Sequence, residues 1–473
     1  RYPERLAPRF RWGIRGICSD GPTMSGQLLW SVLAVAAIPV AGYPWARLLG
    51  LRGPLGIAAA WLVGAGLSVA AMLFLSAAQG RFTRLSLALI WLAVTGAGCI
   101  AAKWTGQPLR PKRPTPPGRA LPALVAIALV VVGVQEAYVW LAAVRVPLGS
   151  FDSWSLWEYK GRLFHLDGMV SGISLHDHAL IFAHPAYPPL LSLLITWVYT
   201  WAGTASPALM KPLFPLFYGA LLSAFLAALR PRLGLGGALV GTAALALVPR
   251  IADYAGTGLA DVPMTAFLVA AAAAYCAFRE EGNCRGLAAC GVLLGFAALT
   301  KRDALPYLGA ALLALGLLER RAGAVAQAAG AALTVCGPWY AYVALTSVPD
   351  RDFLPATASN IGAHFERIGP IARLFLLNLY AVDEWSVLWI AVPAVLLPAL
   401  VYRRVRAPAL LLVIVLPLAA FIASLSLSAW PDYTEHARTS LDRLILGTCP
   451  FALWFVCEQL VPRRHAAESR PAG

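Results

Sequence analysis

Long apolar runs recur along almost the whole chain, and they limit its fold more than any other feature. A helix needs roughly 20 consecutive apolar residues to cross about 30 Å of hydrocarbon. The chain is 59% hydrophobic and only 13% charged, which is not the composition of a soluble protein. Runs near the required length lie at 28–49, 54–79, 85–102, 120–146, 207–229, 233–250, 262–279, 322–346, 385–402, 408–429 and 444–461, and shorter runs lie at 188–203, 286–300 and 304–318.

These runs are predicted to be helices. An unpaired backbone amide in lipid costs several kcal/mol, so only helices and closed barrels cross a membrane. The alternating pattern of barrel strands is absent from the sequence. We therefore predict an all-α, polytopic transmembrane helical bundle of about 12 to 14 membrane segments, with an outer-face loop that carries interfacial helices.

Changes in composition divide the chain into five parts. Met24 directly precedes the first apolar run and could be the true start, so the arginine-rich leader is set aside. The parts are the basic leader 1–24, the N-terminal transmembrane helices 25–102, a basic Pro-rich linker 103–119, the main membrane domain 120–462 and a tail 463–473.

Lysine and arginine clusters predict which loops stay in the cytoplasm, because positively charged short loops are retained there. The clusters lie in the linker 103–119, at 230–232, at 320–321, at 403–406 and at 463–464. This assignment accounts for the net charge of +15 without a nucleic-acid partner, because no contiguous basic and aromatic face is present. It places most carboxylates, and all but one of the seven histidines, in the outer loops 147–187, 250–261, 300–303, 347–384 and 430–443.

One apolar run conflicts with this scheme. The loop before 188 and the loop 250–261 cannot both be external if 188–203, 207–229 and 233–250 all cross the membrane. We therefore interpret 188–203 as a short interfacial or re-entrant helix that opens at the Tyr-Pro-Pro sequence beginning with Tyr187.

The first large outer loop contains the most informative sequence, SFDSWSLWEYKGRLFHLDG at 150–168. Asp152 is a natural N-cap, and the aromatic residues recur at three- and four-residue spacing. This pattern is typical of a helix lying at the level of the lipid headgroups. Asp152 is therefore either a group held at the membrane surface for chemistry or a simple structural cap.

The order of the loop motifs resembles the GT-C superfamily of membrane glycosyltransferases, which includes the dolichyl-phosphate-mannose protein mannosyltransferases and the lipid A aminoarabinose transferase. The matching pieces are Asp152 with the Trp-rich sequence and Lys160 that follow it, HPAYPPLL at 184–191, LADVPM at 259–264, LTKRD at 299–303 and TSLDR at 439–443. The chain departs from the family at 302–304, where many relatives carry an Asn-Glu-Gly sequence.

The resemblance implies a sugar donor linked to polyprenyl phosphate and an acceptor of unknown type, meeting at the periplasmic face of the inner membrane. A phosphate leaving group needs no strong general acid, so the site requires mainly one carboxylate base and cations. Membrane lipids are expected as further partners. The candidate catalytic residues are Asp152, as general base, and Asp261, and the candidate substrate-binding residues are Lys160, Tyr187, Lys301, Arg302, Asp303, Arg438 and Arg443.

Several alternatives stay open at the level of sequence. Asp261 precedes Val-Pro and is positioned as an N-cap, and Lys301 with Arg302 next to Asp303 could be an outer-loop ion pair of little energetic value. Glu136 lies inside an apolar run, where a charge is either structural or lines a pocket. A flippase or transporter of lipid-linked sugars is the alternative to a transferase.

Metal binding also remains an alternative. His176, Asp177 and His178, together with His184, carry groups that ligate zinc or harder divalent ions. Exposed HxH pairs are usually solvated, so we assign no metal ligands and no cofactor. No CxxC spacing indicates zinc, and no outer cysteine pair indicates a disulfide.

Overall fold

The computed structural model describes residues 24–107, 122–282, 284–350 and 352–460. These residues are helical throughout, apart from loops and one isolated bridge between Phe353 and Ser428. The predicted leader before Met24, most of the predicted linker and the tail 463–473 lie outside the described residues.

Eight helices in the described part of the chain are long and apolar enough to span a membrane, and α20 with α21 could form a ninth span that is bent by 46°. This supports the predicted polytopic helical bundle, while the finer count of 12 to 14 segments stays a prediction. The eight are α1 (Met24–Leu48), α2 (Gly53–Ala77), α3 (Arg84–Trp104), α4 (Ala123–Arg145), α9 (Leu213–Ala246, taken with α8, Pro207–Met210), α11 (Asp261–Glu281), α14 (Ala322–Thr346) and α19 (Pro408–Ser426), and the bent pair is α20 (Tyr433–Leu446) and α21 (Cys449–Leu460).

The described residues contain fewer long apolar helices than the sequence predicts, for two physical reasons. The predicted runs 207–229 and 233–250 join into α9, which is broken at Gly234, where a φ of 68° favours glycine. Other apolar runs form helices of only 13 to 17 residues, shorter than the roughly 20 residues of a typical membrane span. These shorter helices are α7 (Leu190–Ala202), α12 (Cys284–Thr300), α13 (Ala304–Glu319) and α18 (Leu388–Val401).

Helix α7 corrects part of the interpretation of 188–203. All of its residues except Trp201 are buried, and the Trp197 indole donates to the carbonyl of Ala34 in α1 at 2.9 Å. A helix enclosed by protein in this way does not lie exposed at the lipid headgroups. A short re-entrant helix is still compatible with its length and position.

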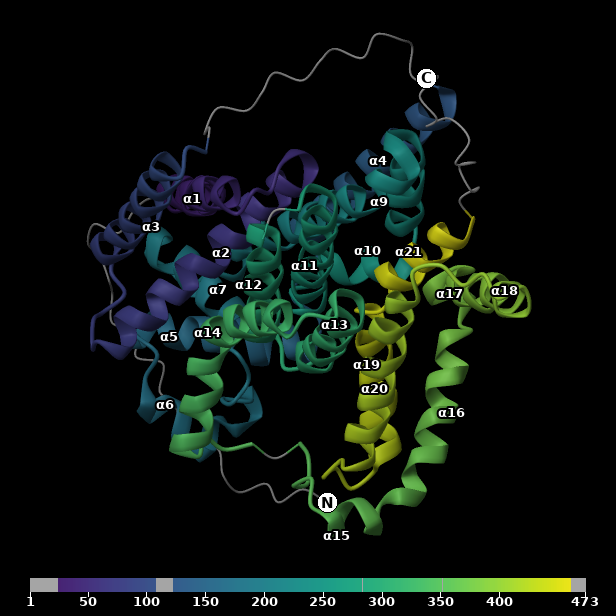
Figure 1. Cartoon of the computed structure of the whole chain (residues 1–473). Coiled ribbons are helices and arrows are strands. Elements are labelled where there is room, and N and C mark those ends of the chain that lie inside the picture. The colour runs from purple at the N-terminus through teal and green to yellow at the C-terminus, as the bar shows by residue number, and fades with distance from the viewer. Residues whose placement is uncertain (1–23, 108–121, 283, 351, 461–473) are drawn as a thin grey trace.

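Small residues allow the bundle to pack tightly. A Cβ on Gly42 of α1 would collide with the carbonyl oxygen of Ala60 in α2, and one on Gly64 would collide with that of Ile38. Gly291 of α12 has the same relation to Ala328 of α14. Close backbone approach of this kind is typical of helix pairs in membranes, and Figure 1 shows α11, α12 and α14 together near the centre of the molecule.

Short helices carry the loops that join these long ones. Helices α16, α19 and α20 pack side by side in the C-terminal part, at the right of Figure 1. The remaining elements are η1 (Ser153–Glu158), α5 (Tyr159–Asp167), α6 (Gly172–His176), η2 (His178–Ala183), α10 (Pro249–Ala255), α15 (Ala358–Ala363), η3 (Phe365–Arg367), α16 (Ile368–Leu379) and α17 (Val382–Trp385).

Candidate active site

The five loops that were predicted to share one face are joined to one another by charged and polar contacts. Each contact links segments that are far apart in the sequence or, in one case, two residues of the same turn. The tertiary structure therefore gathers the acidic loops at one end of the bundle. The contacts are Asp152–Arg443, Tyr254–Asp442, Arg250–Glu384, Asp261–Lys301, Lys301–Asp303, Arg302–Asp350 and His184–Asp352.

Asp152 lies at the start of the helical segment that follows α4. Its backbone is already helical, with φ −63° and ψ −33°, and its side chain makes no capping hydrogen bond. The N-cap interpretation is therefore wrong. Instead, one carboxylate oxygen pairs with the Arg443 guanidinium from α20, and the two side chains are 24% and 17% exposed. The partly exposed position leaves this pair accessible to a ligand.

Lys301 forms the buried centre of the site. Its amine lies 2.7 Å from Asp261 Oδ1 and 2.6 Å from Asp303 Oδ2, and its side chain is 8% exposed. Burial alone would lower the pKa of Lys301, but the two carboxylates raise it above its usual value. This contradicts the alternative of a weak surface ion pair, because a buried pair of this kind is costly to break.

Asp261 differs from its predicted role as an N-cap. It is the first residue of α11, and Ala260 occupies the cap position without a side-chain hydrogen bond. The Asp261 side chain is 1% exposed, and its Oδ2 atom has no hydrogen-bond partner among the described residues. Its geometry suits positioning of Lys301 rather than direct contact with a substrate.

The Asp152 pair and the Lys301 group belong to one charged cluster. The positive charge of Arg443 acts against that of Lys301 and offsets part of the rise in the Lys301 pKa, so the two cations lie within electrostatic range of one another. Gly258 packs against Ser153, since a Cβ there would lie 3.1 Å from the Ser153 Cβ, and this brings the loop before α11 against the Asp152 segment. We call Asp152, Arg443, Asp261, Lys301 and Asp303 the ionic cluster. With two cations and three carboxylates, it carries one net negative charge.

Tyr187 lies between two cations at the edge of this cluster. The Arg302 guanidinium lies 4.8 Å from the centre of its ring, and the Lys160 amine lies 5.9 Å from it. Burial, with the nearby Asp352, raises the pKa of Tyr187 well above its usual value, so the phenol is neutral. Tyr187 therefore acts here as an aromatic contact and a hydrogen-bond donor.

Lys160 is placed less favourably for phosphate than the sequence indicates. It is 3% exposed, and its amine donates to the carbonyls of His184 at 3.2 Å and Tyr187 at 3.4 Å. Burial, together with the charge of Arg302, lowers the pKa of Lys160 to about 7. The η1 segment before it is a π-helix, which changes the residue spacing, so the aromatic face expected from α-helical periodicity is not formed: Trp157 is buried while Trp154 is 44% exposed.

The remaining predicted residues have different surroundings. Arg302 pairs with Asp350, a residue that the sequence did not single out. Arg438 is exposed on α20 and takes no part in the ion pairs found among the described residues. Nothing in its surroundings distinguishes it from a solvated surface arginine.

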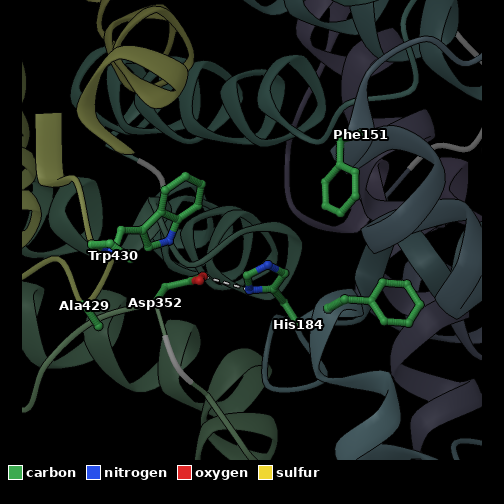
Figure 2. Close-up of a pocket in the computed structure, with 7 residues that line it drawn as sticks. Phe151, His184, Asp352, Ala429 and Trp430 are labelled. Carbon is green, nitrogen blue, oxygen red and sulfur yellow. Dashed lines mark ion pairs between the residues drawn. The ribbon is translucent and has the colours of Figure 1, made fainter. Parts of the chain in front are cut away.

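An open cavity of about 450 Å³ lies beside the ionic cluster. Figure 2 shows Phe151 and His184 on one side of it, facing Asp352 and Trp430 on the other. Asp152 is the neighbour of Phe151, although it does not itself line the cavity among the described residues. The Trp430 ring stacks on His436 with ring centres 4.5 Å apart, which fixes one wall.

The four residues weighed as metal ligands from sequence, His176, Asp177, His178 and His184, form no such group among the described residues. The two ring nitrogens of His176 face the backbone carbonyls of Gly172 and Thr346, to which an imidazole nitrogen can only donate, and Asp177 caps the η2 segment. His184 instead joins Asp350 and Asp352, with one ligand atom from each lying within 4.8 Å of the others. Imidazole and carboxylate groups suit a divalent ion. All three are already engaged, His184 with Asp352 at 2.7 Å, and Asp350 with Arg302.

Sequence reasoning missed several residues of this region. Asp350 and Asp352 were grouped only with the other outer carboxylates, although their spacing of two residues in a loop is a weak signal for a shared site. Trp430 and Phe151 gave no signal, because isolated aromatic residues near apolar runs are usually structural.

The fold and this site define an α-helical membrane-type bundle with a charged cluster at one end. Searches against protein-family models, curated proteins and solved structures each returned no match. The assignment of function therefore depends on the geometry of the site.

Proposed function

We propose that the protein is a membrane glycosyltransferase that moves a sugar from a polyprenyl-phosphate donor to an acceptor at the outer, periplasmic face of the inner membrane. The observation that carries the proposal is the Asp152–Arg443 pair, partly exposed and continuous with the buried Lys301 group. It combines a carboxylate base with a phosphate-binding cation, which are the two groups that transfer from a lipid phosphate requires.

Arg443 is proposed to exchange partners when the donor binds. The Asp152 carboxylate is occupied by the Arg443 guanidinium. A donor phosphate in the site would compete for the guanidinium, since arginine binds phosphate and carboxylate oxygens through the same planar fork. This exchange would free Asp152 when the donor arrives.

The proposed chemical step is a direct displacement. The acceptor oxygen or nitrogen attacks the anomeric carbon, its proton passes to Asp152, and the bond between that carbon and the phosphate oxygen breaks. The electron pair leaves on the lipid phosphate, which Arg443 holds, and the anomeric centre is inverted. Asp261 and Asp303 position Lys301, whose charge lies next to the leaving phosphate.

Labelled polyprenyl-phosphate sugars provide the test. Purified protein in detergent is incubated with a panel of these donors and native lipid extract as the source of acceptor. We expect label transfer by the wild-type protein and a loss of about 100-fold or more for Asp152→Asn, as for removal of a general base. The matched control is Glu366→Gln, which changes an exposed carboxylate of the same group of loops outside the cluster.

The same assay separates the proposal from a flippase, the second candidate. A flippase needs two leaflets and forms no new glycosidic bond, so it yields no labelled product in detergent. Movement of the donor across proteoliposomes without transfer would support the flippase and overturn the transferase. Equal transfer by Asp152→Asn and wild type would remove Asp152 from the mechanism.

A further inference from the structure

A second cavity lies in the apolar part of the bundle, between α1, α2, α4 and α9. Its volume of about 580 Å³ falls within the range of small-molecule sites. Leu28, Val32 and Ile57 line it and are 58%, 54% and 71% exposed, so it opens sideways on a surface that would face lipid. No member of the ionic cluster is among its described lining residues.

The cavity is an elongated groove. Along α1 its lining extends from Leu28 to Pro39, which corresponds to about 17 Å at the helical rise of 1.5 Å per residue. The shape and the apolar walls suit one hydrocarbon chain entering from the bilayer.

Two polar groups on this groove lack partners among the described residues. Glu136 of α4 accepts a hydrogen bond from the Trp140 indole through Oε1 at 3.1 Å, while its buried Oε2 accepts none. Trp61 of α2 is 4% exposed, and its indole N–H donates to no described group. In an apolar region each unpaired group of this kind costs free energy, so both favour a ligand that pairs with them.

The space beside Glu136 is kept open by a glycine. A Cβ on Gly219 of α9 would lie only 3.4 Å and 3.5 Å from the two Glu136 oxygens. Any larger side chain at this position would therefore fill the volume next to the unpaired oxygen.

The two unpaired groups differ in what they demand of a ligand. Glu136 Oε2 needs a donor, and Trp61 Nε1 needs an acceptor. A hydroxyl supplies both, an alkylammonium supplies only donors, and a carboxylate or phosphate supplies only acceptors. We propose that this groove binds a single-chain amphiphile that ends in a hydroxyl, a long-chain alcohol, which donates to Glu136 and accepts from Trp61.

Binding of tritiated tetradecanol to the full-length protein in nanodiscs tests the proposal, with tetradecylamine and myristate as probes of equal chain length. We expect saturable binding of one alcohol per protein, tighter than that of either other probe. Glu136→Gln should weaken binding about fivefold, since an amide of the same shape replaces the carboxyl group that pairs with the alcohol. Trp61→Phe should have a similar effect, and Tyr138→Phe, on the same helix and outside the groove, should have none.

Gly219→Leu should abolish binding by filling the groove, and a thermal unfolding scan shows whether that variant folds. If it does not, the two conservative variants still decide the question. Unsaturable and equal uptake of all three probes, which would indicate ordinary bilayer chains, overturns the proposal. Tighter binding of the amine or the acid, or unchanged affinity in both Glu136→Gln and Trp61→Phe, also overturns it.

Discussion

Arg443 of α20 pairs with Asp152, a residue 291 positions earlier in the chain. The pair joins the last outer loop to the first, and it lies within electrostatic range of the buried Lys301 group. The charges of this end of the bundle are therefore organised by contacts between distant segments. Each of these contacts makes a prediction that can be measured.

Removing the buried amine is expected to destabilise the fold. Lys301→Met leaves Asp261, which is 1% exposed, as an unpaired buried carboxylate, and breaking such a pair costs about 3–5 kcal/mol. Thermal and denaturant unfolding of the variant in detergent should show a clear loss of stability.

A double variant separates charge burial from simple loss of packing. Lys301→Met combined with Asp261→Leu removes both charges of this buried pair. Replacing a buried ion pair by apolar residues often changes the free energy of unfolding very little. We expect most of the lost stability to return while transfer activity stays absent. A double variant as unstable as Lys301→Met alone would contradict the importance of the buried charge.

Arg443→Lys keeps the positive charge of the site and removes the planar fork. Because lysine binds a phosphate oxygen as a point charge, it should hold the donor less precisely. We expect kcat/KM for the lipid-linked donor to fall about 10- to 100-fold, from the loss of one or two charged hydrogen bonds. Arg438→Lys, an exposed arginine of the same helix, serves as the control and should behave as wild type.

The buried Lys160 predicts a specific pH dependence of stability. Its pKa is lowered to about 7 by burial and by Arg302, so between about 7 and about 10.4 the unfolded chain binds the proton more strongly. Stability therefore rises with pH across this window, by up to about 1.4 kcal/mol per pH unit, and the cost of the buried charge is fully present below pH 7.

Comparison with Lys160→Met isolates this effect from other titrations. The variant carries no amine, so wild type should gain stability relative to it between pH 7 and pH 9.5. Unfolding midpoints at several pH values measure the difference. A constant difference across this range would show that the Lys160 pKa is not lowered.

The sidedness of the bundle can be tested by labelling. Asp177 and Arg403 are exposed residues in loops predicted to lie on opposite sides of the membrane. We expect a membrane-impermeant maleimide to label Asp177→Cys in intact spheroplasts, and Arg403→Cys only after the membrane is opened. The described native cysteines are buried or half-buried, so wild type provides the background. If Arg403→Cys were labelled in intact spheroplasts and Asp177→Cys were not, the orientation would be reversed. The ionic cluster would then lie at the cytoplasmic face of the membrane.

Part of the site could be predicted because loop position and charge are local properties. The motifs around Asp152, Asp261, Lys301 and Arg443 were placed on one face from the arrangement of apolar runs, and the structure brings all four into one cluster. Two local interpretations were wrong. Asp152 and Asp261 resemble N-caps by position, but each side chain turns to a distant cation instead of the helix end.

The apolar helices, and the expectation that the acidic loops share one face, follow from the sequence alone, since helix formation in lipid depends on the length and polarity of each run. The tertiary structure sets which charges pair. In the folded protein Lys160 is buried, Arg302 pairs with Asp350, and Glu136 lines a groove formed with α1, α2 and α9. The physical reason is that the strength of an ionic contact depends on burial and partner distance, which are set when segments far apart in the sequence pack together.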